Sequence, residues 1–298
     1  MISLRRRGQW LILCLALVGC LAACEIPWPL RRPTPPSPQS EMALDNPALL
    51  RVATCWAGQP LIETLSESYM AEVPATVFDL KAMDSRLAEA LIHEGKVDLA
   101  LVIRRYDAET RQALLTEEDH ALQPLVLALD ALGVVVSQDH PLDGLSAADM
   151  AQLFAGHHPD WSALGGPKGK PDLILPMEGT VPRELFANAL MGERAFSSTA
   201  RIVPHDRDVL AHVREQELAV GLASRAWVQG EDGRGTKMLA IEGVAPEPPA
   251  ILSGAYPLTY ALVLLRAPEA PQAVVPFTAW CTDPRVRRMH QGQYLSPP

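Results

Sequence analysis

From residue 49 onward, short apolar runs alternate with amphipathic segments that have a helical repeat. Runs with the pattern of β-strands lie at 49–54, 75–80, 96–103, 132–137, 172–177, 201–204, 218–224, 237–243 and 256–267. Segments with apolar residues three and four positions apart lie at 60–73, 84–95, 146–156, 181–192, 206–216, 272–281 and 284–292. Strands that alternate with helices at this spacing predict an α/β fold.

The N-terminal part of the chain follows a different pattern. Three arginines at 5–7 precede an apolar run at 10–24, which is short for a membrane span and ends in small residues. This arrangement is typical of an export signal. The run contains two sequences that resemble lipoprotein boxes, LVGC ending at Cys20 and LAAC ending at Cys24. We expect residues 1–23 to be a signal peptide and Cys24 to be lipidated, with Cys20 as the alternative; a plain cleaved signal or a short anchor stays open.

A proline-rich segment separates this signal from the folded part. Residues 24–48 contain seven prolines and few side chains that can build a core. Such a composition predicts a semi-extended tether. The N-terminal 48 residues together predict a protein that is held by lipid on the extracytoplasmic side of a cell membrane, in the periplasm or at the cell surface.

The charge of the chain restricts its partners. The formal net charge is −9, and removal of residues 1–23, which hold three arginines and no acid, makes it −12. An acidic chain argues against nucleic acid or an anionic lipid surface as a partner. It does not argue against a small anion, because backbone dipoles can hold such an ion locally.

The cysteines indicate neither a metal site nor a redox motif. None of the five has CxxC spacing, so we expect no metal and no cofactor. If the signal is cleaved before Cys24, then Cys55 and Cys281 are the remaining free thiols. An exported protein allows them to form a disulfide, but separation along the chain does not decide whether they are close enough.

Several motifs, taken in order, resemble those of one known family. LFAGHHPDWSALGG at 153–166 resembles a hallmark of the phosphate-binding proteins of ABC importers, in which a helix and Phe-x-Gly precede Asn-Trp-Ser-x-x-Gly-Gly. The segments ELAVGLAS, SGAYPLTYALVLL and PFTAWCTDPRVRRMHQGQYLSP follow in the order that this family uses. The resemblance covers about 49–298, and its anion site is divergent.

The resemblance implies a two-lobe periplasmic binding protein fold of type II, with a hinge and a cleft between the lobes. Lobe I is then expected at 49–126 plus 251–298, and lobe II at 127–250. The family also implies a monomer that binds phosphate or a similar oxyanion and passes it to the permease of an ABC importer. No catalytic motif is present, so we expect no enzyme.

The first loop of the family's site departs most from its pattern. The family has Gly-Ser-Thr after the first strand, whereas this chain has Thr54, Cys55 and Trp56. The resemblance places Cys55 and Trp56 at the ligand. The indole either packs under the loop, fills the pocket or stacks on a different ligand, and these alternatives stay open.

Three further positions match better. Ser85 stands where the family has a serine at a helix start, and its hydroxyl either caps the helix or binds the oxyanion as well. Asp98 corresponds to an aspartate that accepts the proton of a hydrogen phosphate, which sulfate does not carry; the alternative is an Asp at a strand end facing water. Arg104 ends the same strand, where the family often has an arginine facing the cleft.

The third loop keeps only part of the family's anion-binding turn. Gly179 and Arg183 match the pattern Arg-x-x-Gly-Ser-Gly-Thr-Arg-Glu-x-Phe, and Thr180 replaces its serine but keeps a hydroxyl. Val181 and Pro182 add bulk and remove an N–H group, and a proline replaces the first arginine. Arg183 either turns inward to supply a cation or stays on the solvent side of its helix.

Two functional hypotheses follow. The first is a lipid-anchored solute-binding protein for phosphate or a related oxyanion. The second is a sensor or interaction protein that keeps the fold but has a degenerate anion site. Ser85, Asp98, Thr180 and Arg183 favour the first hypothesis, and the altered first and third loops favour the second.

Overall fold

The computed structural model describes residues 47–107 and 122–297, which belong to one compact unit. The expected signal peptide, Cys20, Cys24 and the tether as far as residue 46 lie outside the described residues. Within the described ranges, none of the helices is long and apolar enough to cross a membrane.

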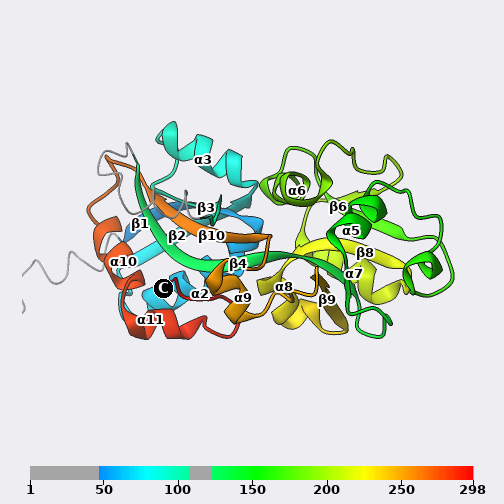
Figure 1. Ribbon diagram of the computed structural model, residues 1–298. Helices are drawn as coiled ribbons and strands as arrows, with labels where there is room; N and C mark the ends of the chain where they lie inside the picture. Colours follow the sequence, from blue (N-terminus) through cyan, green and yellow to red (C-terminus); the bar gives the residue numbers. More distant parts are fainter. Residues whose placement is uncertain (1–46, 108–121, 298) are drawn as a thin grey trace, which may run out of the picture. The chain divides into compact units, whose positions relative to one another are not determined.

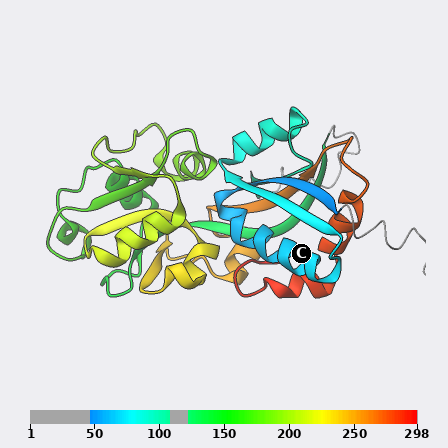
Figure 2. The same cartoon turned by 180° about the vertical axis from the view of Figure 1, so that it is seen from behind.

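Lobe I is built on a sheet in the order β2-β1-β3-β10-β4. Its strands are β1 (Ala48–Cys55), β2 (Thr76–Met83), β3 (Leu99–Arg105), β10 (Thr259–Arg266) and the first part of β4 (Gln123–Ser137). β1 is parallel to β2 and β3, whereas β10 is antiparallel to β3 and β4. α3 (Ser85–His93) lies on one side of this sheet, and α2 (Gln59–Glu72) and α11 (Pro284–Met289) lie on the other, near α10 (Val274–Cys281) (Figure 1 and Figure 2).

Lobe II is built on a second sheet, which begins with the last part of β4. β8 (Ala219–Ser224) and β9 (Thr236–Ile241) pair with β4, β6 (Asp172–Pro176) and β7 (Arg201–Val203) continue the sheet, and β5 (Gly144–Leu145) pairs with β9. Its helices are α5 (Ala147–Phe154), α6 (Val181–Phe186), α7 (Asp206–Glu215) and α8 (Arg225–Gln229). Four short helical segments complete the chain: η1 (Trp56–Gly58), η2 (Trp161–Leu164), η3 (Ala187–Met191) and η4 (Glu231–Gly233).

The two lobes share β4. Its first part pairs with β10 through Ala131, and its last part pairs with β8 and β9 from Leu132 onward (Figure 1). The second crossing runs from α9 (Pro248–Ser253) to β10, and the backbone N–H of Leu132 donates to the Leu258 carbonyl there. The lobe limits expected at 126 and 250 fall inside β4 and α9.

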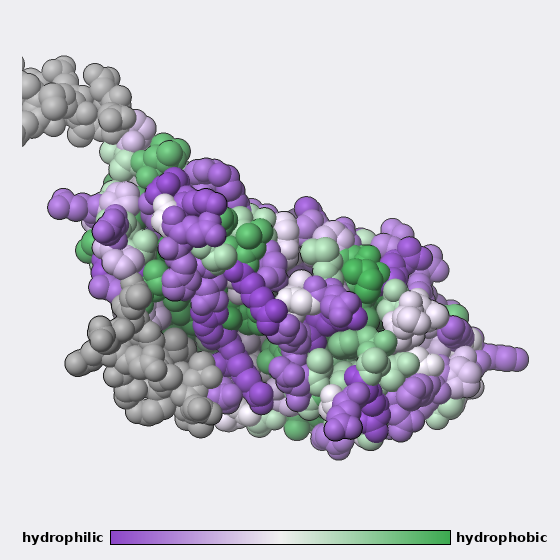
Figure 3. Space-filling model, turned by 90° about the horizontal axis from the view of Figure 1, so that it is seen from above, coloured by the Kyte–Doolittle hydropathy of each residue, from purple (hydrophilic) through white to green (hydrophobic). Residues whose placement is uncertain are grey.

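Each lobe has aromatic side chains in its core. In lobe I, Tyr69 packs against Phe277 with ring centroids 5.2 Å apart. In lobe II, Trp161 is fully buried and its Nε1 donates to the Leu218 carbonyl. The exposed face seen in Figure 3 is mostly polar, with smaller hydrophobic areas between the polar side chains.

The disulfide that the sequence left open is not formed. Cys55 and Cys281 are both buried free thiols. Burial raises the pKa of each to about 12, so both thiols stay protonated at neutral pH.

Candidate functional site

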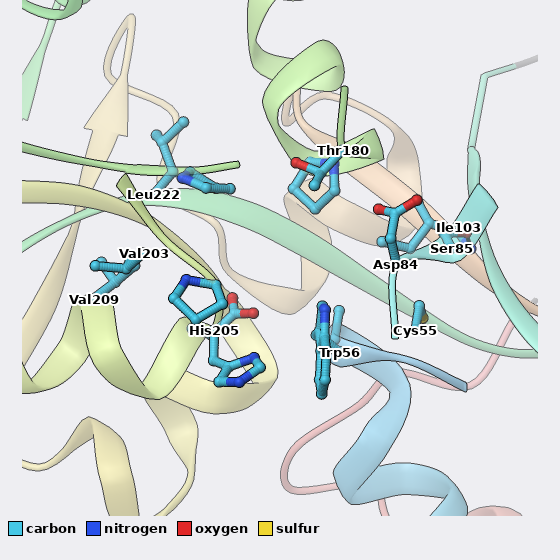
Figure 4. Close-up of a pocket in the computed structure, with 15 residues that line it drawn as sticks. Cys55, Trp56, Asp84, Ser85, Ile103, Thr180, Val203, His205, Val209 and Leu222 are labelled. Atoms are coloured by element: carbon cyan, nitrogen blue, oxygen red, sulfur yellow. Dashed lines mark hydrogen bonds between the residues drawn. The ribbon is translucent and has the colours of Figure 1, made fainter. Parts of the chain in front are cut away.

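A small pocket lies between the two lobes, with a volume of about 30 Å³. Lobe I contributes residues at 55–57 and 84–85, and lobe II contributes the turn after β6 and residues 203–206 (Figure 4). A water molecule needs about 10–15 Å³ of such space. The pocket therefore holds only about two waters in this arrangement of the lobes.

Helical segments begin at the pocket from both lobes. η1 and α3 begin there in lobe I, and α6 and α7 begin there in lobe II. The first N–H groups of a helix lack partners within that helix, and the dipole adds a partial positive charge. Pro182 in the first turn of α6 has no N–H group, so this segment offers fewer donors than the others.

Carboxylates, and not cations, provide the charge of the pocket. Asp84 caps α3 by accepting a 2.8 Å hydrogen bond from the Arg86 backbone N–H. Asp206 Oδ1 accepts from the Ser224 backbone N–H at 2.6 Å. Burial raises the pKa of Asp206 to about 6 against the opposing effect of these backbone donors. None of the described residues that line the pocket is lysine or arginine.

Of the predicted site residues, Ser85 and Thr180 line the pocket, but neither caps its helix with its side chain. Ser85 is the first residue of α3, and its Oγ accepts a 2.8 Å hydrogen bond from the Ile103 N–H. Its hydroxyl proton remains available to a ligand. The Thr180 hydroxyl donates to the Met177 carbonyl at 2.8 Å and therefore stabilises the turn before α6.

Trp56 and Cys55, the other predicted residues at the pocket, come from the end of β1 and the start of η1. The Trp56 indole meets the His205 imidazole edge-on, with ring centroids 4.1 Å apart. His205 Nδ1 is buried and has no hydrogen-bond partner among the described residues. The sequence alternative that the indole fills the pocket agrees with this geometry.

Asp98 does not line the pocket. It lies directly before β3, five positions from Ile103, which is the residue of that strand at the pocket. Arg51 holds Asp98 with Nη2 to Oδ1 at 2.6 Å and Nε to Oδ2 at 3.2 Å, and the Arg51 backbone N–H donates to Oδ2 at 2.8 Å. The sequence expectation of a ligand-facing acid is corrected here, because Asp98 is fully occupied as an ion-pair partner.

Arg104, Gly179 and Arg183 also lie outside the pocket lining. Arg104 forms an ion pair with Glu89 and donates to the Ile103 carbonyl. Arg183 donates to the Pro176 carbonyl at 3.2 Å, and its guanidinium lies 4.7 Å from the centre of a phenylalanine ring. Gly179 has φ 80°, and with Arg183 it lines a separate surface groove of lobe II. Arg183 therefore does not turn inward.

Sequence reasoning missed the acids and the imidazole of the pocket. Asp84 directly precedes Ser85, and His205 and Asp206 belong to an HDRD sequence that indicated only a helix start. Their shared signal was a position at the beginning of a helix that follows a strand. That signal alone does not tell which of several such helices meet in space.

Comparisons with known proteins agree with this geometry. Residues 40–284 match the family model described as PBP superfamily domain. The phosphate-binding protein PstS 2 of Streptococcus pneumoniae is 29% identical over 104 residues, which are 35% of this chain and 33% of that protein, so the chain matches only about a third of its length. The phosphate-binding protein PstS of Bacillus subtilis is 23% identical over 70% of this chain and 67% of its own length.

A solved structure supports the fold. A phosphate ABC transporter substrate-binding protein with bound phosphate from Clostridium perfringens superposes with a TM-score of 0.73 at 16% identity, covering 84% of this chain and 100% of that one. The expected similarity to phosphate-binding proteins and the expected two-lobe α/β fold are both confirmed. The relatives are transport binding proteins rather than enzymes, which supports the expectation of no enzymatic activity at the level of the family.

Proposed function

This chain belongs to the PBP superfamily, and we propose that it is an extracytoplasmic solute-binding protein that delivers phosphate or a related oxyanion to an ABC importer. The observation that carries the proposal is the pocket between the two lobes, where helical segments of both lobes begin. Backbone N–H groups at such positions favour an anion without a charged side chain. The relatives named as phosphate-binding proteins support the same class of cargo.

The side chains of the pocket favour an oxyanion that still carries a proton. Asp84 and Asp206 can accept a hydrogen bond from a P–OH group, and the Ser85 hydroxyl can donate to another oxygen. Sulfate offers no proton at neutral pH, so the carboxylates repel it. The role of acceptor that the sequence assigned to Asp98 passes to these two acids.

The N-terminal segment completes the proposal. Lipidation of Cys24 and a tether at 24–48 would keep the binding domain near a membrane and within reach of the permease. Mass spectrometry of the mature N-terminus tests this part, because an acylated Cys20 or an unmodified N-terminus contradicts the assignment. The alternative of a sensor or interaction protein is not favoured, since the named relatives are transport binding proteins.

Calorimetry with the mature protein tests the cargo. We expect phosphate to bind and sulfate to give no heat of binding. Asp206→Asn should reduce this discrimination, because an amide can donate to a fully ionised oxyanion where a carboxylate can only accept. Asp208→Asn in the same helix is the matched control, since Asp208 is outside the pocket. If neither anion binds to the folded protein, the oxyanion proposal fails.

A further inference from the structure

The turn that carries Trp56 is held on both sides. The Ala57 carbonyl accepts a 2.7 Å hydrogen bond from the hydroxyl of Tyr294, which is fully buried. The Trp56 carbonyl accepts a 3.2 Å hydrogen bond from Nε1 of Trp227 in α8 of lobe II. Gly58 packs so closely on Leu101 that a Cβ there would lie 2.6 Å from its Cδ2. The backbone of η1 therefore has little freedom to move its indole away.

The indole itself lies across the pocket. Figure 4 shows Trp56 facing His205 from the opposite side, with Cys55 beside it and Thr180 farther along the pocket wall. The contact with His205 joins the end of β1 in lobe I to the start of α7 in lobe II. The hydrogen bond from Trp227 joins the same two lobes, so two of the contacts between them depend on one residue.

A third contact closes the rim. Arg86 at the start of α3 forms an ion pair with Glu184 of α6, and both side chains are substantially exposed. Exposed ion pairs contribute little to stability. The aromatic contact is therefore the more important interaction between the lobes near the pocket, and it is made entirely by side chains of the protein.

The size of the pocket leads to the same conclusion. An indole is among the largest side chains and covers about 150–250 Å² when buried. The space left beside it is about 30 Å³, which suits water but not a tetrahedral oxyanion. A ligand of that size needs the place that Trp56 now occupies.

We propose that Trp56 is a plug: its indole takes the position of the ligand, clasps the two lobes together and thereby determines which ligands enter the pocket. The inference rests on the proposed function only for the identity of the ligand. A cargo molecule binds after the indole leaves His205, so the apparent affinity is lowered by the fraction of molecules in which the plug is in place. Trp56 thus sets both the size limit and the affinity of the site.

Distances between the lobes in the absence of ligand test the plug directly. Leu87 in α3 and Glu178 before α6 are exposed on opposite lobes, so spin labels on Leu87→Cys and Glu178→Cys report the separation by pulsed electron resonance. Trp56→Ala should shift the distances to longer values and broaden them. Trp280→Ala removes an indole of lobe I outside the pocket and should leave them unchanged. An identical distribution for the parent and a folded Trp56→Ala variant overturns the plug.

Phosphate titration then separates the plug from the proposed cargo. If the plugged form outnumbers the open form by about ten to one, Trp56→Ala binds inorganic phosphate about tenfold more tightly than the parent. Equal or weaker binding by the folded variant also overturns the plug, provided that the parent binds phosphate. If no variant binds phosphate, the proposed cargo is wrong, and the label distances alone decide whether Trp56 holds the lobes together.

Discussion

Two regions of the molecule hold buried carboxylates in opposite ways. At the start of β3, Asp98 receives three hydrogen bonds from Arg51, two of them from the guanidinium. At the junction of the lobes, Asp130 accepts from the Ala226 N–H and the Tyr260 hydroxyl, and Asp206 accepts from the Ser224 N–H. A carboxylate neutralised by a guanidinium is structural, whereas one held by neutral donors in a dry site titrates near neutral pH.

The pKa values make the difference concrete. Burial raises the pKa of Asp130 to about 7, and the hydrogen bond from Tyr260, the other donors and the nearby charge of Arg225 only partly oppose it. Burial raises the pKa of Asp206 to about 6. The lobe junction is therefore the part of the described structure in which proton uptake accompanies folding.

The largest expected effect is the pH dependence of stability. Because the pKa of Asp130 is higher in the folded protein than in the unfolded chain, the folded state binds the proton more tightly. The free energy of unfolding should therefore fall as pH rises from about 4 to about 7, by up to about 1.4 kcal/mol per pH unit for this group.

Chemical denaturation of the parent and of Asp130→Asn across this range checks the prediction. An amide oxygen still accepts from Ala226, so the variant should fold and should lose this part of the slope. An unchanged slope would show that Asp130 does not titrate in the folded protein.

The next effect concerns the structural carboxylate. Arg51→Met leaves Asp98 buried with only a backbone donor, so the free energy of unfolding should fall by about 2–3 kcal/mol. Phosphate affinity should not change, because Asp98 lies outside the pocket. Lys81→Met, which removes an exposed ion pair with Asp79, is the control and should cost at most about 1 kcal/mol. A loss of binding without a loss of stability would return Asp98 to the ligand site.

A smaller effect is expected on ligand binding. Protonation of Asp206 below about pH 6 removes one negative charge from the pocket wall. Phosphate should therefore bind more tightly at pH 5.5 than at pH 8, by about tenfold for a change of about 1.4 kcal/mol in binding free energy. Calorimetry at both pH values measures this ratio. Asp206→Asn should reduce the ratio, whereas an equal ratio in the variant would assign the pH dependence to Asp84 or to the ligand.

The smallest effect is expected at the rim. Glu184→Gln removes the ion pair with Arg86. Since both side chains are exposed, the free energy of unfolding should change by less than about 1 kcal/mol. The label distances should also stay close to those of the parent. A large opening of the lobes in this variant would mean that the rim, and not Trp56, holds them together.

Local patterns predicted most elements because period and capping residues act within a few positions. The strand expected at 49–54 is β1, and the helix expected at 84–95 contains α3. β4 is longer than the strand expected at 132–137, since its first part is a strand only through pairing with β10. The helix expected at 181–192 is α6 followed by the π-helical segment η3.

The sequence by itself determined the alternation of strands and helices, the similarity to phosphate-binding proteins, and Ser85, Thr180, Cys55 and Trp56 as residues of the site. Only the tertiary structure decided which carboxylates face the pocket. Asp98 is five positions from Ile103, and that distance along β3 separates an ion pair with Arg51 from the ligand pocket. Asp206 is far from both in the chain, yet β7 and α7 bring it to the same pocket. Motif order records neighbours along the chain, whereas the pairing of strands across two lobes decides neighbours in space.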